Sequence, residues 1–298
     1  MLAKTLSFSS PGRLSTKHEQ LVYDGEDGLH RTFPIEDLGY VIVETPMMSV
    51  TSAVLQKLAA ANVAFVLCDA AHLPAAQLLP YAAHSTTQET TAAQLAASDA
   101  VQGRIWRQLV RSKIRNQAKL LLRLDHPAPA KRLESIADEV KNRDETNCEA
   151  QAARLYFQTL LDGVNRNPEG DWPNCALNYG YAILRAAVAR ALVGAGLICI
   201  RGVHHHNRYD PLCLADDIME PYRPFVDQYV LGKVPPFDIP ATELDKTMKA
   251  RLLQMLTCDV KLGDVKRPLS IAVTFTAASL AKFYLEKSDS LSLPEFVS

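Results

Sequence analysis

The sequence predicts an α+β protein, with a small N-terminal antiparallel β domain over residues 1–84 and a larger all-α domain over residues 85–298. Two observations support this division. Before residue 84, short apolar stretches alternate with turn signals built from Gly, Pro and Asp, which is typical of a sheet made of hairpins. After residue 85, apolar residues recur with the helical period in one segment after another.

The expected strands and helices follow in chain order. In the first domain a helix, capped by Ser49 or Thr51 and running to about Ala60, interrupts the strands. The expected strands are Thr5–Phe8, Leu14–Leu21, Arg31–Phe33, Tyr40–Glu44 and Asn62–Leu67. The expected helices of the second domain are 88–97, 101–124, 132–141, 146–161, 176–193, 212–231, 242–257 and 270–287, with a Gly/Pro/Asn loop over Asn165–Pro173.

The composition indicates a globular cytoplasmic protein. Of the 298 residues, 48% are hydrophobic and 22% charged, which suits a packed core. The formal net charge is −1, so any binding to nucleic acid has to come from a local patch. The six cysteines form no CxxC pair, which excludes zinc-ribbon and thioredoxin-like sites and indicates reduced thiols. No signal-peptide-like run follows Met1, and the apolar run Ala191–Ile200 is too short to span a membrane.

A basic helix is expected over residues 101–124, which hold seven Lys or Arg side chains and no acid. Four of the arginines fall at i, i+3, i+7 and i+11, so they form a cationic stripe on one face. This spacing favours contacts with DNA phosphates. The alternative is a solvated face that pairs with carboxylates of neighbouring helices. The predicted DNA-binding residues are Arg104, Arg107, Arg111, Arg115 and Lys119.

Three consecutive histidines occupy positions 204–206. If this segment is extended, His205 points away from its two neighbours, because side chains alternate along a strand. The three histidines are therefore not expected to bind the same metal ion together. The alternative is an exposed polar turn that leads into the next helix.

That next helix carries three acids close together. Asp217 and Glu220 share a face at i, i+3, and Asp216 and Glu220 are neighbours at i, i+4. Acids in the first turns of a helix are also favoured by the helix dipole, which is the structural alternative. Pro221 argues against that alternative as a full account, because proline kinks or ends a helix and so places Glu220 at an irregularity.

Glu149 is a third candidate acid. The segment Thr146–Glu149 has the form of a capping box, with Thr146 as N-cap and Glu149 at N3, so a purely structural role is an open alternative. If Glu149, His205 and Glu220 converge, one imidazole and two carboxylates suit Mg²⁺ or Mn²⁺. Such a site supports phosphoryl transfer. The sequence lacks HExxH, P-loop and GxSxG motifs, so zinc protease, NTPase and hydrolase interpretations have no support.

Four ordered segments resemble the CRISPR-associated integrase of the adaptation module, in the form found with a single RNA-guided effector nuclease. These segments are Glu149–Phe157, Asn174–Arg185, Gly202–His205 and Leu214–Pro224. The resemblance implies an N-terminal β domain, a C-terminal α domain and a homodimer in the bacterial cytoplasm. It implies two such dimers around one dimer of a small ferredoxin-like companion, with the effector nuclease as a further partner. It also implies that 3′-hydroxyls of captured double-stranded DNA attack a CRISPR repeat in two transesterifications.

The resemblance also implies a site. The metal ligands, which would hold Mg²⁺ or Mn²⁺, are Glu149, His205 and Glu220, and the family's Gly-x-x-His pattern selects His205 among the three histidines. Many relatives have an aspartate at the position of Glu220, which keeps the oxygen chemistry. Asp217 is expected to support the site or the DNA. No role is assigned to His204 or His206.

Three other functions remain open at this stage. A plain endonuclease that resolves branched DNA would use the same metal site. A non-catalytic DNA-binding scaffold would need only the stripe from Arg104 to Arg123. A metal-dependent oxygenase would need His204 and His206 to converge on an acid, but the helix is expected to point its acids in another direction.

Overall fold

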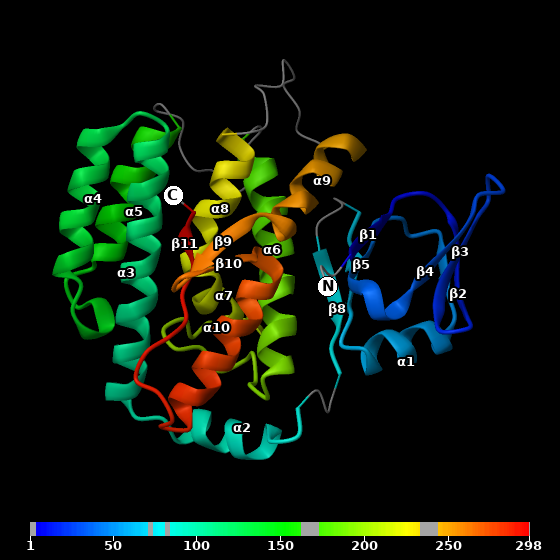
Figure 1. The fold of residues 1–298 in the computed structure, drawn as a ribbon, viewed down its shortest axis with the longest axis horizontal. Helices are drawn as coiled ribbons and strands as arrows, with labels where there is room; N and C mark the ends of the chain where they lie inside the picture. The colour runs from blue at the N-terminus through cyan, green and yellow to red at the C-terminus, as the bar shows by residue number, and fades with distance from the viewer. Residues whose placement is uncertain (1–3, 71–73, 81–83, 162–172, 233–243, 298) are drawn as a thin grey trace. The chain divides into compact units, whose positions relative to one another are not determined.

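The computed structural model describes residues 4–70, 74–80, 84–161, 173–232 and 244–297 (Figure 1). The chain forms two compact units, Met1–Ser85 and Thr86–Ser298. In agreement with the predicted fold class, strands dominate the first unit and helices dominate the second. The loop expected over Asn165–Pro173 lies outside the described residues except for Pro173.

The first unit contains two four-stranded sheets, in the orders β4-β3-β2-β6 and β1-β5-β7-β8. One helix, α1 (Ser52–Ala60), and a 3₁₀ turn (Ile35–Asp37) complete it. Leu14, Leu21 and Leu58 are fully buried in its core. The strands are β1 (Lys4–Phe8), β2 (Gly12–Lys17), β3 (Gln20–Gly25), β4 (His30–Pro34), β5 (Leu38–Val43), β6 (Met48–Val50), β7 (Ala64–Cys68) and β8 (Pro74–Leu78).

The expectation of a purely antiparallel domain is wrong. Strands β2, β3 and β4 form antiparallel hairpins, but β5 runs parallel to both β1 and β7, and β2 runs parallel to β6. Helix α1 lies in the connection from β5 to β7, and such helical crossovers return the chain in the same direction. Every residue of β5 is buried, a continuous apolar run that is typical of parallel strands.

In the residues that the structure describes, the second unit is helical except for one small sheet. Its helices are α2 (Thr87–Ala96), α3 (Asp99–Arg123), α4 (Pro127–Glu139), α5 (Cys148–Leu160), α6 (Asn174–Gly194), α7 (Cys213–Met219), α8 (Arg223–Asp227), α9 (Lys246–Leu253) and α10 (Leu269–Tyr284). Shorter helical turns are Asn142–Asp144, Glu220–Tyr222, Gln228–Gly232 and Gln254–Thr257. No helix in the described ranges is both long and apolar enough to cross a membrane.

The expectation of an all-α second domain is wrong at the three-stranded sheet β10-β9-β11. Strands β9 (Asp259–Leu262) and β10 (Val265–Pro268) form a hairpin, and β11 (Glu295–Phe296) pairs with β9. Gly263 has φ +57° at the hairpin turn, a left-handed conformation that favours glycine. The Gly263-Asp264 pair between the apolar residues Leu262 and Val265 was a usable hairpin signal in the sequence.

Helix α3 organises the second unit. It packs against α4 and α5 on one side and against α7, α8 and β11 on the other (Figure 1). Ser98 caps it by accepting a hydrogen bond from the amide of Val101 (3.4 Å), and Ile105, Leu109 and Ile114 on its apolar face are fully buried. The C-terminal segment after α10 runs back along α3, so the polar face of this helix is partly covered by the chain's own end.

Candidate active site

The kink predicted at Pro221 is present. The expected helix over 212–231 is interrupted: α7 ends at Met219, Glu220–Tyr222 form a 3₁₀ turn, and α8 begins at Arg223. The side-chain amide of Asn116 on α3 donates to the carbonyl oxygen of Pro221 (2.9 Å). This buried hydrogen bond ties the irregular turn to α3, so Glu220 faces that helix.

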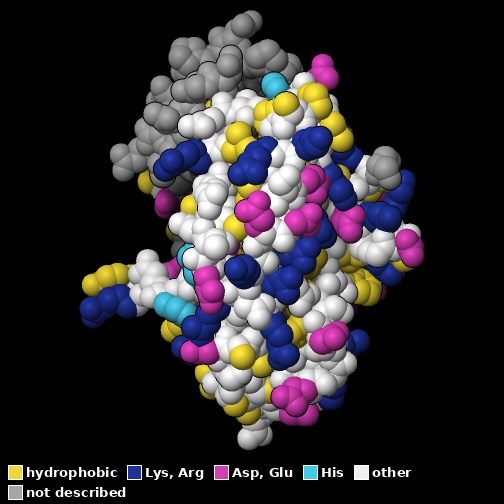
Figure 2. All heavy atoms as spheres, turned by 90° about the vertical axis from the view of Figure 1, so that its left-hand side faces the viewer, with side chains coloured by type: hydrophobic (Ala, Val, Ile, Leu, Met, Phe, Trp, Pro, Cys, Tyr) yellow, Lys and Arg dark blue, Asp and Glu magenta, His cyan; other side chains and the backbone are white. Residues whose placement is uncertain are grey.

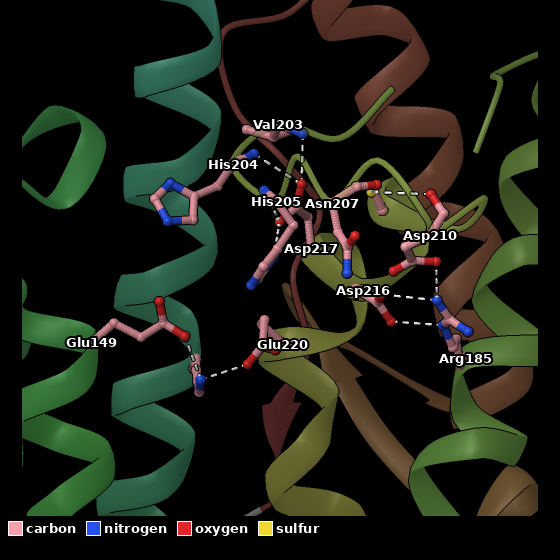
Figure 3. A network of polar contacts seen from close by, with 12 residues as sticks. Glu149, Arg185, Val203, His204, His205, Asn207, Asp210, Asp216, Asp217 and Glu220 are labelled. Atoms are coloured by element: carbon pink, nitrogen blue, oxygen red, sulfur yellow. Dashed lines mark hydrogen bonds and ion pairs between the residues drawn. The ribbon is translucent and has the colours of Figure 1, made fainter. Parts of the chain in front are cut away.

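Glu149 lies in the first turn of α5, but not in a capping box. Asn147 at the N-cap has φ +53° and no capping side-chain bond, and Thr146 does not cap the helix. Instead, the carboxylate of Asp144 accepts the amides of Cys148 (2.8 Å) and Glu149 (2.9 Å). The prediction that Thr146 caps this helix is therefore wrong, because Asp144 does so. The Glu149 side chain is not used as a cap and instead accepts a hydrogen bond from Lys113 of α3 (Figure 3).

Lys113 of α3 joins the two glutamates. Its Nζ atom lies 2.6 Å from Oε1 of Glu149 and 2.5 Å from Oε2 of Glu220 (Figure 3). Burial lowers the pKa of Lys113, but the charges of Glu220 and Glu149 outweigh burial and raise the pKa above its ordinary value. A protonated lysine therefore sits between carboxylates that are 71 positions apart in the sequence.

Glu220 is an ionised buried acid. Burial by itself raises its pKa, but the charges of Arg223 and Lys113 lower it to about 2. Nε of Arg223 donates to Oε1 of Glu220 (2.8 Å). The buried Oε2 atom lies 2.5 Å from Nζ of Lys113 and has no other hydrogen-bond partner among the described residues. A carboxylate oxygen in this condition is chemically suited to a cationic ligand.

Asp217 is fully buried and organises the histidine loop. Its carboxylate accepts the backbone amides of Val203 (2.5 Å), His204 (2.9 Å) and His205 (3.2 Å). A Cβ at Gly202 would lie 2.9 Å from Oδ2 of Asp217 and 2.3 Å from the carbonyl oxygen of His205, so only glycine fits. The segment is not extended, which was the condition for alternating side chains, because consecutive amides turn toward one carboxylate.

The rings of His204 and His205 point in different directions, as expected for a single ligand. Nδ1 of His205 donates to Oδ1 of Asp217 (2.6 Å), which leaves Nε2 as the ring nitrogen for a ligand. The hydrogen bond to Asp217 raises the pKa of His205, burial opposes it, and the charges of Asp217, Glu220 and Glu149 add to the rise. His204 instead stacks on Trp106 of α3, with ring centroids 4.3 Å apart at 6°.

Glu149, His205 and Glu220 thus come from three segments to one face of α3 (Figure 3). In the described part of the chain, no three His, Cys, Asp or Glu side chains are grouped closely enough to hold a metal ion. The donor chemistry nevertheless fits Mg²⁺ or Mn²⁺, because two carboxylates and one imidazole are available and the carboxylates already enclose a cation, the Lys113 ammonium group.

Asp216 lies outside this group. Its carboxylate accepts two hydrogen bonds from Arg185, through Nε (2.7 Å) and an Nη atom (2.9 Å), and Arg185 also pairs with Asp210. Burial and a hydrogen bond with Asp210 raise the pKa of Asp216 to about 6, against the opposing effect of Arg185. This cluster fastens the loop before α7 to α6 (Figure 3).

The basic stripe has partners within the chain. Arg111 and Arg115 lie 3.3 Å and 3.1 Å from Oδ1 of Asp138, and Lys119 lies 2.7 Å from Oε2 of Glu295. Elsewhere on the stripe, Arg107 donates to the carbonyl of Val140 (3.1 Å), and Arg104 lies over the ring of Phe283. Figure 2 shows the side of the molecule on which α4 and α5 lie, and there Lys and Arg side chains are mixed with Asp and Glu. Paired carboxylates are thus present, and DNA binding by the stripe stays a prediction.

Residues 6–256 match the family model of the CRISPR associated protein Cas1. The chain belongs to the Cas1 family. It is 33% identical over its full length to the CRISPR-associated endonuclease Cas1 of Neisseria meningitidis serogroup C, covering 97% of that protein. It is 26% identical over 91% of its length to the CRISPR-associated endonuclease Cas1 2 of Pyrobaculum aerophilum, covering 95% of that protein.

Solved structures share the fold of this Cas1-family chain. A casposase bound to integration product has a TM-score of 0.81 at 20% identity, with 98% of this chain and 93% of that chain covered. A Cas1 protein from Thermotoga maritima has a TM-score of 0.76 at 17% identity, covering 99% and 100%. A chain of a Cas6-RT-Cas1–Cas2 complex has a TM-score of 0.77 at 20% identity, covering 99% and 36%. At these identities the likeness concerns the fold alone.

Sequence reasoning missed four residues that build the site of this Cas1-family chain. Lys113, Asn116 and Trp106 lie on α3, and Asp144 precedes α5. From the sequence, Lys113 was counted only as one of the seven cations of the basic helix. Its position seven residues from buried Trp106 and Leu120 and four from buried Leu109 was a signal that it faces inward. Asp144 was not recognised as the cap. Both Arg143 and Asp144 have a positive φ, a turn conformation that was not anticipated from the sequence.

Proposed function

We propose that this Cas1-family protein is a metal-dependent DNA endonuclease and integrase. It inserts captured DNA fragments into a CRISPR repeat by transesterification with DNA 3′-hydroxyls. The observation that carries the proposal is the convergence of Glu149 and Glu220 on one cationic centre, with His205 beside them. The names of the curated relatives, CRISPR-associated endonucleases, and the fold shared with a casposase bound to integration product support it.

Glu149, Glu220 and Nε2 of His205 are the groups proposed to hold Mg²⁺ or Mn²⁺. When bound, the ion supplies charge neutralisation at the phosphate that is transferred. The rest is done by the chain's own residues. Asp217 holds Nδ1 of His205 and so fixes the orientation of the imidazole. Asp144 accepts the amides of Cys148 and Glu149 and so caps the first turn of α5, and Arg223 keeps Glu220 ionised.

The proposed assembly is a homodimer whose residues 1–84 contact the second copy and a small ferredoxin-like companion. Two such dimers surround one companion dimer on double-stranded DNA, in a system with a single RNA-guided effector nuclease as a further partner. The matched chain of a Cas6-RT-Cas1–Cas2 complex supports the companion subunit. The DNA phosphates are proposed to meet Arg104, Arg107, Arg111, Arg115 and Lys119. The proposed location is the bacterial cytoplasm, in keeping with six cysteines that form no disulfide in the structure.

A strand-transfer assay tests the proposal. A short DNA with 3′-hydroxyl ends is mixed with a plasmid that carries the repeat, with Mg²⁺ or Mn²⁺, with and without the companion protein. Joined product is expected with the wild type and not with Glu149→Ala. Hydrolysis without joined product, even with the companion, would establish a plain endonuclease instead. Full DNA activity of Glu149→Ala would establish a non-catalytic scaffold.

A further inference from the structure

The proposed metal site already holds a cation of its own. Nζ of Lys113 is within 2.6 Å of a carboxylate oxygen of Glu149 and within 2.5 Å of one of Glu220. Its side chain is 10% exposed and that of Glu220 is 5% exposed. Breaking a buried ion pair by removing one partner is strongly unfavourable, since it leaves an uncompensated charge. The three side chains therefore form one electrostatic unit.

Lys113 differs from the other cations of its helix. Lys119, two turns further on, forms an exposed pair with one acid, Glu295, and its side chain is 37% exposed. Lys113 instead bridges two acids from two other elements, α5 and the turn after α7. Together with Arg223, it balances the charges of Glu149 and Glu220. The formal charge of these four side chains is therefore neutral.

We infer that Lys113 is the resident counter-ion of the Glu149–Glu220 pair, and that a divalent cation enters the site by displacing its ammonium group. This inference rests on the proposed metal-dependent function. Oε1 of Glu149 and Oε2 of Glu220 cannot contact an ammonium group and a divalent ion at once, because like charges a few ångströms apart repel strongly in a buried site. The two cations compete for the same oxygens, so each weakens the binding of the other.

Displacement has a consequence for DNA. With a divalent ion between the carboxylates, the positive charges of the site exceed the negative charges, and the ammonium group of Lys113 becomes available to a phosphodiester. A phosphate is then favoured in the site. The metal-free site is neutral and gives no such attraction. DNA and the metal ion are therefore expected to bind cooperatively, through a side chain that is not itself a metal ligand.

Lysine reactivity measures the displacement directly in the wild-type protein. Reductive methylation followed by mass spectrometry reports how accessible each ammonium group is. Lys113 is expected to react slowly without metal, because it is held between two carboxylates, and faster when Mg²⁺ is added. Lys4 is the matched control, since it pairs with a single acid, Asp37, and its side chain is 58% exposed. Its reactivity should not respond to Mg²⁺. An unchanged reactivity of Lys113 at saturating Mg²⁺ overturns the inference.

Calorimetric titration with Mn²⁺ measures the competition. Lys113→Gln is expected to bind Mn²⁺ more tightly than the wild type, by about 5- to 150-fold, which is the usual range of coupling between two ligands. Its melting temperature should be lower than that of the wild type without metal and should recover with Mn²⁺. Lys4→Gln should leave the Mn²⁺ affinity unchanged. Should Lys113→Gln fail to fold without metal, the methylation experiment on the wild type decides the question.

Glu149→Gln separates the two levels of the proposal. If Mn²⁺ binds to the wild type and Glu149→Gln abolishes binding, but Lys113→Gln has the wild-type affinity, the metal site stands and the role of Lys113 is wrong. If the wild type binds no Mn²⁺, or Glu149→Gln binds it unchanged, the proposed metal-dependent function fails and the inference fails with it. Tighter binding by Lys113→Gln together with metal-dependent methylation supports both.

Discussion

Nδ1 of His205 lies 2.6 Å from Oδ1 of Asp217, and the same buried carboxylate accepts the backbone amides of Val203, His204 and His205. One side chain therefore fixes both the path of the loop and the orientation of the imidazole that it carries. This explains why an acid with no direct place among the proposed ligands stands beside them in the sequence. It also makes Asp217 a positioning residue whose effect can be measured.

Asp217→Asn should reduce strand transfer by about 10- to 100-fold, as is usual when the partner of a metal-binding histidine is lost. The amide nitrogen replaces one acceptor of the loop amides, so the free energy of unfolding should also fall by about 1–3 kcal/mol. Turnover assays and urea unfolding check the two effects. Asp216→Asn is the control, because its carboxylate contacts Arg185 and not the loop amides. Equal losses in both variants would remove the assigned role.

His205 gives stability a pH dependence. Its pKa is raised in the folded state above the ordinary value of 6.5. The folded state therefore holds the proton more tightly, and this stabilisation is complete below pH 6.5 and is lost as the pH rises through the folded pKa. The difference in unfolding free energy between the wild type and His205→Gln should shrink over that window. Denaturant unfolding at a series of pH values without metal measures it, and a constant difference would contradict the shift.

Glu220→Gln should destabilise the protein at neutral pH. The pKa of Glu220 is lowered from 4.5 to about 2, so its charge contributes roughly 3 kcal/mol that is present above pH 4.5 and lost as the pH falls through about 2. Urea unfolding should show this loss at pH 7 and a smaller difference in acid. Glu295→Gln breaks the exposed pair with Lys119 and should cost less than about 1 kcal/mol. Similar costs at pH 7 would argue against the buried network.

Asp144→Ala should cost about 0.5–2 kcal/mol of stability, the usual loss when a helix cap is removed. It should also reduce strand transfer, because the first turn of α5 positions Glu149. Thr146→Ala should have little effect on either, since Thr146 does not cap the helix. Thermal unfolding and turnover of the two variants compare the caps directly. A larger effect at Thr146 would restore the capping box.

Arg107→Gln and Arg111→Gln should weaken DNA binding and flatten its salt dependence, if these side chains leave Val140 and Asp138 for phosphates. Each lost phosphate contact lowers the slope of log K against log salt by about 0.9 on duplex DNA. Fluorescence anisotropy at several salt concentrations provides the measurement. Lys57→Gln, which breaks an ion pair with Glu19 in the first unit, is the control. An unchanged slope would assign the stripe to intramolecular pairing alone.

The sequence by itself determined what local rules can reach. The division into a strand-rich and a helix-rich part and the kink at Pro221 depend on spacings of a few residues, and the resemblance selected His205. The resemblance added Glu149 to the site, which no spacing argument did. Strand direction was beyond these rules, since a short apolar run such as β5 is compatible with either direction.

Only the tertiary structure decided how the stretch from His204 to Glu220 becomes a site. The packing of α3 against α5 and the turn after α7 brings Lys113 between two acids that follow it by 36 and 107 positions. No helical or strand period extends that far. The same packing pairs the Glu149 carboxylate with Lys113 of α3, so it is not used in a local cap. Charges in a buried site depend on which neighbours remain after water is excluded, and those neighbours are set by the fold.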